Sequence, residues 1–237
     1  MSAGLPPAMP APGRRRALRD LGLVAVAAPL ALAVIGIGRA RAADPRIELL
    51  EAVRLDDAIA VRRLLAAAVS PNIREKTHGP AIVMAAKLES FDSLAELARA
   101  PGVDLEASDA SGQTALMMAA IKGHAPSVGL LLERGAKVDG PSGWTALHYA
   151  ASGGHTDVAR ILLRHGAKLD ARSDNGTTPA MLAARQKHFS TMELLVDMGA
   201  DVETRNERGM SVIGYLRAHD ENERIAALRE RIARRRR

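Results

Sequence analysis

The chain of 237 residues has no cysteine and very few aromatic side chains: one Trp, two Tyr and two Phe. Without cysteine, disulfide bonds, thiol nucleophiles and cysteine-ligated metal or redox sites are all excluded. The few rings leave little on which nucleobases or sugars could stack, which argues against single-stranded nucleic acid and carbohydrate as ligands. The apolar fraction of 47% and the charged fraction of 25% are nevertheless those of a folded globular chain.

Common catalytic signatures are missing as well. The sequence contains no H-E-x-x-H, no G-x-S-x-G and no G-x-x-x-x-G-K-[ST] motif, and residues 129–137 fail the last by spacing and by their final residue. It also lacks a paired acid and base or an activated nucleophile. We therefore expect a protein that is not an enzyme and needs no cofactor. An enzyme with its chemistry hidden in a groove is the least favoured alternative.

The net charge of +6 is concentrated at the two ends of the chain. Residues 1–42 carry a net charge of +5 and residues 223–237 another +5, whereas residues 43–222 carry −4. Because the positive charge is not spread over a folded face, nucleic acid is not an expected partner.

Residues 1–42 have the three parts of an export signal. Arginines at 14–16 and 19 precede an apolar run over 21–38, and Ala40-Arg41-Ala42 provides the small residues that export peptidases accept. The segment from Gly13 to Arg19 also resembles the twin-arginine export motif, with Ala17 where a bulky apolar residue is usual. We expect cleavage near Ala42 and a periplasmic protein of a bacterium with a GC-rich genome. The alternative is an uncleaved anchor that holds the chain on the inner membrane, facing the periplasm.

After residue 43 a single period organises the sequence. Small or apolar positions recur at steps of 33, 34, 31, 33 and 33 residues, at Ala52, Ala85, Ala119, Ala150, Ala183 and Leu216. This period predicts stacked units of two short helices and a return loop. Glycines in the left-handed conformation should end three of the second helices, at Gly135, Gly166 and Gly199. Hydroxyl side chains should cap four of the first helices, at Thr114, Thr145, Thr178 and Ser211.

The segment from Gly143 to Ala151, GWTALHYAA, followed by Gly153-Gly154-His155, closely resembles the core of an ankyrin repeat. Neighbouring units repeat parts of it, at residues 113–116, 123–124 and 178–181. The resemblance implies an all-α solenoid of about six helix-turn-helix units joined by β-hairpin loops. The units should lie near 46–75, 76–108, 109–139, 140–172, 173–205 and 206–232, within a repeat domain over 43–222. The first unit is expected to be a polar cap, and the hairpin between Asp139 and Gly143 should be stunted.

Histidine and methionine invite metal-site interpretations that the spacing disfavours. His124, His155 and His188 are equivalent in successive units, which places them about 10 Å apart, too far to share one zinc ion. We therefore expect turn histidines that bond neighbouring backbone, His148 bonding Thr145, and no metal site. Five methionines should be buried between units rather than bind copper: Met84, Met117, Met118, Met181 and Met192.

The resemblance also implies where a partner would bind. In ankyrin-like solenoids the hairpin tips and the ends of the first helices form a continuous concave surface. The residues predicted to contact a partner protein are Trp144, Arg185, Gln186, Ile121, Lys122, Gln113, Thr177, Arg208 and Met210. Trp144, with Ile121, Lys122 and Arg185 on flanking units, is a candidate anchor cluster, since Trp and Arg are enriched among binding hot spots. The alternative is that Trp144 only packs on its neighbours.

Residues 223–237 form a basic tail with a helical pattern. Its apolar stripe of Ile225, Leu228 and Ile232 should dock on the last unit and leave the arginines in solvent. The alternative is weak contact of these arginines with an anionic membrane surface or an acidic partner.

The expected function is binding of another protein by a monomeric, exported repeat module. One alternative is an accessory or inhibitory, immunity-like subunit of a particular periplasmic enzyme or toxin. Another is a membrane-tethered scaffold. The identity of the partner is not encoded in the repeat frame, which carries unrelated partners in different proteins.

Overall fold

The computed structural model describes residues 44–140 and 143–235. The predicted signal peptide over 1–42 lies outside these residues. Within them the helices come in six successive pairs: α1 (Pro45–Arg54) with α2 (Ala58–Ala66), α3 (Ala81–Lys87) with α4 (Phe91–Arg99), α5 (Ala115–Ile121) with α6 (Ala125–Glu133), α7 (Ala146–Gly153) with α8 (Thr156–Arg164), α9 (Pro179–Arg185) with α10 (Phe189–Met198), and α11 (Val212–Ala218) with α12 (Asn222–Arg235). We number these pairs as repeats one to six.

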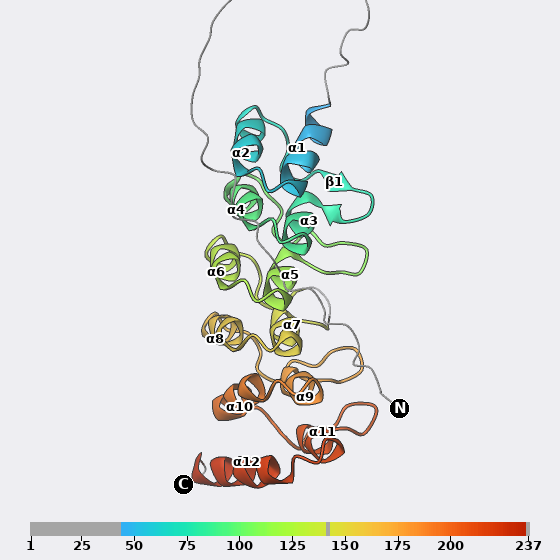
Figure 1. The fold of residues 1–237 in the computed structure, drawn as a ribbon, viewed down its shortest axis with the longest axis vertical. Coiled ribbons are helices and arrows are strands. Elements are labelled where there is room, and N and C mark those ends of the chain that lie inside the picture. The colour runs from blue at the N-terminus through green and yellow to red at the C-terminus, as the bar shows by residue number, and fades with distance from the viewer. Residues whose placement is uncertain (1–43, 141–142, 236–237) are drawn as a thin grey trace, which may run out of the picture. The chain divides into compact units, whose positions relative to one another are not determined.

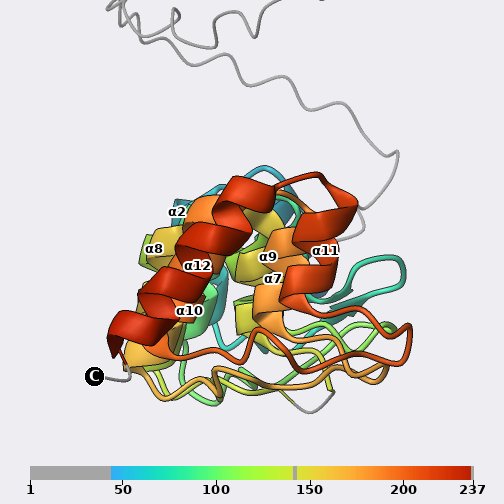
Figure 2. The same cartoon turned by 90° about the horizontal axis from the view of Figure 1, so that it is seen from below.

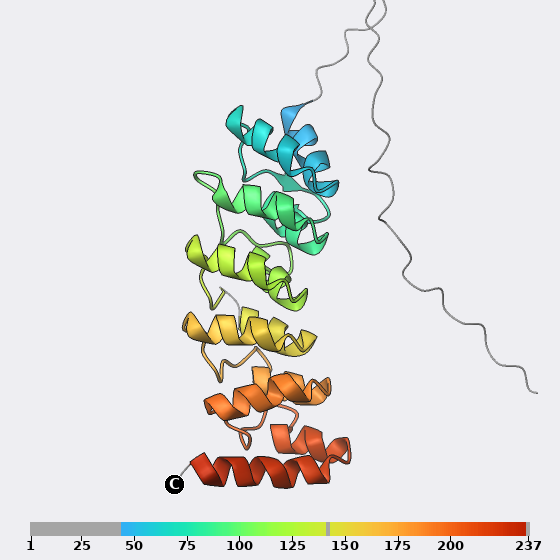
Figure 3. The same ribbon diagram turned by 60° about the vertical axis from the view of Figure 1, so that its left-hand side comes forward.

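The pairs stack in chain order (Figures 1 and 3). The first helix of each repeat packs on the first helix of the next, from α1 through α11, and these are called the inner helices. The second helices, from α2 through α12, pack on one another in the same way and are called the outer helices. Seen along the stack, the loops between repeats gather on one side of the helices (Figure 2). The stacked helix pairs predicted from the period, and the all-α solenoid implied by the resemblance, are therefore confirmed.

Local signals begin and end these helices as predicted. The hydroxyls of Thr114, Thr178 and Ser211 accept hydrogen bonds from backbone N–H groups three residues on, at 3.3, 3.4 and 3.1 Å. Left-handed glycines follow three outer helices, with φ of 95° at Gly135, 87° at Gly166 and 112° at Gly199. The predicted methionine positions are also right, since all five side chains are buried.

Regular strand pairing is sparse. Among the described residues, β1 (Arg74–Glu75) and β2 (Gly79–Pro80) form one antiparallel pair, and Ser108 and Thr114 form a single bridge. Later loops close instead with one backbone bond from residue i to i+4, at 173–177 and 206–210, both 3.0 Å long. The expected stunted hairpin at 139–143 includes residues outside the described part of the chain.

The two ends of the stack agree with expectation to different degrees. The first repeat is not uniformly polar: Ile47, Leu55 and Ile59 are 58%, 76% and 80% exposed. At the other end, α12 buries Ile225 and Leu228 against the last repeats, as its apolar stripe predicted.

The expectation that the arginines of α12 all point into solvent is wrong. Arg224 bonds Glu193 at 2.6 Å and lies 3.9 Å from the centre of the Phe189 ring. Arg231 bonds both Glu193 and Asp197, at 3.1 and 2.6 Å. The helix is thus held to α10 by ion pairs as well as by its apolar stripe, because its i and i+7 arginines lie on the side that faces α10.

Candidate functional site

The loops that join the repeats are fixed by their own side chains. The Asp109 carboxylate accepts bonds from the N–H groups of Ser111 and Gln113, at 2.8 and 2.9 Å. In the sixth repeat Asn206 Oδ1 accepts from Arg208 and Met210 in the same manner, at 3.1 and 3.0 Å. A loop fixed in this way loses little conformational entropy when it binds a partner.

Side chains also join several loops to the neighbouring repeat. Arg74 donates to the carbonyl of Ser108 at 2.9 Å, and Gln113 Nε2 donates to the Tyr149 hydroxyl at 3.1 Å. Asn206 Nδ2 donates to the Thr177 hydroxyl at 3.2 Å. The described loop residues over 74–80, 108–114, 143–145, 172–177 and 205–210 are called the loop row.

Thr177 does not belong to the exposed surface. Only 2% of it is exposed, because the loop of the next repeat covers it and Asn206 bonds its hydroxyl. Its predicted place at an exposed loop tip is therefore wrong. The spacing located the loop correctly, but it could not show which tip residue the following repeat covers.

Trp144 is half-buried and packs on its own repeat. Its ring centre lies 5.5 Å from that of His148 and 5.9 Å from that of Tyr149. His148 is fully buried, and its Nδ1 accepts from the Thr145 N–H at 3.1 Å while the Thr145 hydroxyl lies 2.9 Å away. Its Nε2 therefore carries the proton and donates to the Thr177 carbonyl at 3.0 Å. The predicted bond between His148 and Thr145 is confirmed, and burial lowers the pKa of His148 despite the Thr177 carbonyl.

The C-terminal ends of the inner helices form a second row, called the helix-end row. Lys122 bonds Glu89 of the preceding repeat at 2.6 Å, and His155 Nε2 bonds the carbonyl of Ile121 at 2.9 Å. His219 Nε2 bonds the carbonyl of Arg185 at 3.1 Å. Because these bonds join ends to ends, the inner helices run parallel and their ends lie next to one another along the stack.

Trp144 and the other members of the predicted anchor cluster lie at opposite ends of the inner helices. Trp144 precedes α7, whereas Ile121, Lys122 and Arg185 end or follow their helices. At a rise of about 1.5 Å per residue, a helix of this length separates the two ends by about 10 Å. The predicted residues therefore fall into the loop row and the helix-end row rather than into one compact cluster.

The remaining predicted residues differ in exposure. Arg185, Gln186, Lys122 and Arg208 are exposed, and Gln113, Ile121 and Met210 are half-buried. Two exposed cations of the helix-end row, Lys187 and Arg217, were missed by the sequence reasoning. The signal for Arg217 was available, since it lies in the last turn of the inner helix of the sixth repeat, as Arg185 does in the fifth.

The turn histidines have structural partners. His124 stacks on Phe91, with ring centres 3.7 Å apart, and its Nδ1 bonds the Ser127 hydroxyl at 2.8 Å. Both histidines bond neighbouring backbone, as predicted: His155 bonds the Ile121 carbonyl of the preceding repeat, and His124 Nδ1 accepts from the Ser127 N–H at 3.3 Å. Over residues 44–140 and 143–235, no group of three or more His, Asp or Glu side chains is arranged to hold a metal ion.

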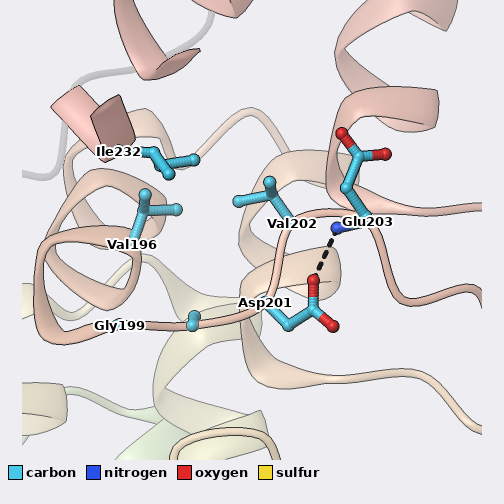
Figure 4. A pocket seen from close by; sticks show the side chains of 7 residues that line it. Val196, Gly199, Asp201, Val202, Glu203 and Ile232 are labelled. Atoms are coloured by element: carbon cyan, nitrogen blue, oxygen red, sulfur yellow. Dashed lines mark hydrogen bonds between the residues drawn. The ribbon is translucent and has the colours of Figure 1, made fainter. Parts of the chain in front are cut away.

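A concavity of about 340 Å³ lies beside α12, lined by the end of α10 and the loop that follows it (Figure 4). Its floor is the apolar Val196, Val202 and Ile232, and its rim carries Asp201 and Glu203. Asp201 is already engaged, because it accepts from the N–H of Glu203 at 2.8 Å and from the Thr204 hydroxyl at 2.5 Å. The concavity holds no pairing of nucleophile and base, and it lies apart from both rows.

No helix in the described part of the chain is long and apolar enough to cross a membrane. The apolar run over 21–38 is outside that part.

Comparison with known proteins gives one clear match. The family model described as ankyrin repeats (3 copies) matches residues 49–141 and 138–206, which is more than half of the chain. No curated protein matches the sequence. Repeats of this family generally mediate binding between proteins, and their proteins are typically not enzymes. From the stacked helix pairs and this match, the chain belongs to the ankyrin-repeat family.

Proposed function

We propose that this protein is an exported binding module that holds a partner protein against its loop row and its helix-end row. The observation that supports this most is that, in the last repeats, some polar side chains fix the loops while others are exposed and form no bond within the described chain. Loop backbones are fixed by their own hydrogen bonds, while Arg185, Gln186 and Arg208 are exposed and make no side-chain bond within the described chain. Polar side chains that the fold does not use, on a rigid support, suit recognition of another protein.

The test is affinity capture from envelope extract with the purified chain as bait. Two double variants go beside it: Arg185→Ala with Gln186→Ala on the helix-end row, and Arg160→Ala with Arg164→Ala on the outer helix α8, all four exposed residues. One protein retained by the parent and by the α8 variant, but lost with the helix-end variant, would support the proposal. Equal retention by all three would move the binding surface elsewhere.

Trp144 is less suitable as the first variant. Because its ring packs against His148 and Tyr149, its loss would also disturb the fourth repeat. A lost interaction could then reflect a change of fold rather than of surface.

Export is proposed on the sequence of residues 1–42 alone. The arginines at 14–16 and 19, the apolar run and the Ala-x-Ala site support it. Cell fractionation with N-terminal sequencing of the recovered protein tests it. A periplasmic form beginning near residue 43 supports cleavage, and a full-length membrane-bound form supports the anchor alternative.

A further inference from the structure

The cations of the helix-end row fall into two groups. In the second and third repeats they are neutralised: Lys87 is paired with Asp109, and Lys122 with Glu89 at 2.6 Å. Burial works against the ionised form of Asp109. The Lys87 ammonium and two backbone N–H groups outweigh it and lower the pKa of this carboxyl. These lysines therefore serve contacts between repeats.

The cations of the fifth and sixth repeats have no such partners. Arg185, Lys187 and Arg217 are exposed, and no carboxylate of the described chain lies within ion-pair distance of them. The bond from His219 to the Arg185 carbonyl holds the ends of α9 and α11 together. Successive helix ends are about 10 Å apart, which is about one Debye length, so the fields of the three cations add. We call Arg185, Lys187 and Arg217 the cationic end.

Attraction to the helix dipole accounts for only part of the cationic end. Arg185 and Arg217 are in the last turns of α9 and α11, where cations are favoured. Lys187 lies beyond the helix, in a left-handed turn with φ of 61°. The third and fourth repeats have Gly123 and Gly154 at this place, and a side chain there costs about 1 kcal/mol.

Charged residues at the same turn of two other repeats have an evident structural use. Asp56 accepts from the N–H of Ser93 at 2.8 Å, and Glu89 pairs with Lys122. Within residues 44–140 and 143–235 Lys187 makes no side-chain bond, so no hydrogen bond or ion pair there offsets the strain of its turn. Asp220, the equivalent residue of the sixth repeat, is exposed, and Glu221 and Glu223 follow it, Glu221 being bonded to Arg224 at 3.4 Å. These carboxylates reduce the positive charge of the region, but within the described chain none of them pairs with Arg185, Lys187 or Arg217.

The loop row of the same repeats, at the other end of the inner helices, also carries basic residues. The Arg172 guanidinium donates to the backbone carbonyl of Arg205 at 3.1 Å, and the Arg205 guanidinium donates to that of Gly209 at 2.8 Å. They keep their full charge, since a carbonyl does not neutralise it. Arg208 is exposed in the same loop, and Asp174 and Glu207 are the nearby acidic residues in the sequence.

We propose that the cationic end is the place where the partner is recognised, and that the segment of the partner that contacts it is acidic, rich in Asp and Glu. This inference rests on the proposed function, because it names the chemistry of the partner bound there. On the helix-end row, the cations of repeats two and three are paired with carboxylates and those of repeats five and six are not, so we expect the partner at the C-terminal part of this row.

The test is a titration of fluorescein-labelled octaglutamate with the purified chain, followed by anisotropy at low ionic strength. The surface variant is Arg185→Glu with Arg217→Glu. The control is Arg160→Glu with Arg164→Glu on α8, which makes the same change of net charge at residues that also have no ion-pair partner. We expect the surface variant to weaken binding by at least about tenfold and the control by less than about twofold. An equal loss in both variants would overturn the proposal, because the attraction would then be diffuse.

Lys187→Gly separates binding from folding. Glycine relieves the left-handed turn, so this variant should be more stable in urea and yet bind octaglutamate more weakly. Unchanged binding would show that Lys187 takes no part and would overturn its inclusion in the cationic end. Binding of an oligothymidylate that depends on the same arginines, with no binding of octaglutamate, would also overturn an acidic peptide as the ligand.

Failure of this inference is distinguishable from failure of the proposed function. The Arg185→Glu, Arg217→Glu variant is then tested against a captured partner. If it still binds that partner, and if the affinity does not change with salt between about 50 and 200 mM, the acidic segment is contradicted while protein binding stands. If the chain captures no partner at all, the proposed function itself fails.

Discussion

Replacing His148 by leucine tests whether the inner helices depend on the buried histidine network. The Thr145 N–H has His148 Nδ1 as its partner, so His148→Leu leaves a buried donor without a bond, at a cost of about 1–3 kcal/mol. The Thr177 carbonyl loses one bond but keeps two from Ser173, so its loss is about 0.5–1.5 kcal/mol. We therefore expect a fall of about 2–4 kcal/mol in the free energy of unfolding.

Urea unfolding followed by circular dichroism and by Trp144 fluorescence measures this change. The tryptophan is the only one in the chain and lies beside His148, so its fluorescence reports on the fourth repeat, whereas circular dichroism reports on the helices of the whole stack. His165→Leu is the matched control, because His165 is exposed and bonds only the carbonyl of its own helix. A loss below about 1 kcal/mol for His148→Leu would refute the assignment of an unsatisfied donor.

The same variant makes a prediction about pH. Burial lowers the pKa of His148 in the folded chain, so below about pH 6.5 the unfolded state binds more protons and stability falls with pH. His124 contributes in the same direction, since burial lowers its pKa too. His148→Leu should therefore reduce this dependence but not remove it. A parent protein whose stability stays constant from pH 7 to pH 5 would contradict the buried neutral histidines.

Three other perturbations follow from particular contacts. Arg231→Glu should lower the free energy of unfolding by about 0.5–1 kcal/mol and speed hydrogen exchange in α12, because it places a third carboxylate beside Glu193 and Asp197. Arg229→Glu is the control and should change little, because Arg229 has no ion pair within the described chain. Gly123→Ala should lower the free energy of unfolding by at least about 1 kcal/mol more than Gly102→Ala. Both glycines have a left-handed φ, of 70° and 72°, but only a Cβ at 123 would clash with a neighbour, the His155 ring. In an NMR titration the pKa of Glu75 should be about 2, because the N–H and ring of His78 and the N–H of Thr77 bond its carboxylate. A pKa near the ordinary value of a glutamate would contradict this.

The parts of the structure that depend on local sequence were predictable. The period near 33 located the helix pairs, because each unit repeats the same pair and loop. Hydroxyls before apolar runs located the caps, because a cap bonds N–H groups of its own first turn. The buried methionines followed from their place on inner faces. His148 was identified through its three-residue spacing from Thr145.

The parts of the structure that depend on contacts between repeats could not be predicted from the sequence. Burial of Thr177 requires the loop of the next repeat, and the pairing of Arg224 and Arg231 requires the position at which α12 packs on α10. The separation of Trp144 from Lys122 and Arg185 reflects the length of an inner helix, which a list of loop tips and helix ends leaves out. No residue of the described chain covers Ile47, Leu55 and Ile59 of the first repeat, and the structure does not explain their exposure.

Hydrogen exchange of the chain in complex with its captured partner tests the central claim most directly. We predict slower exchange on binding in the loops over 172–177 and 205–210 and at the helix ends over 185–187 and 217–220, with the outer helices α4, α6 and α8 unchanged. Protection confined to those outer helices, or to α12, would contradict binding through the loop row and the helix-end row.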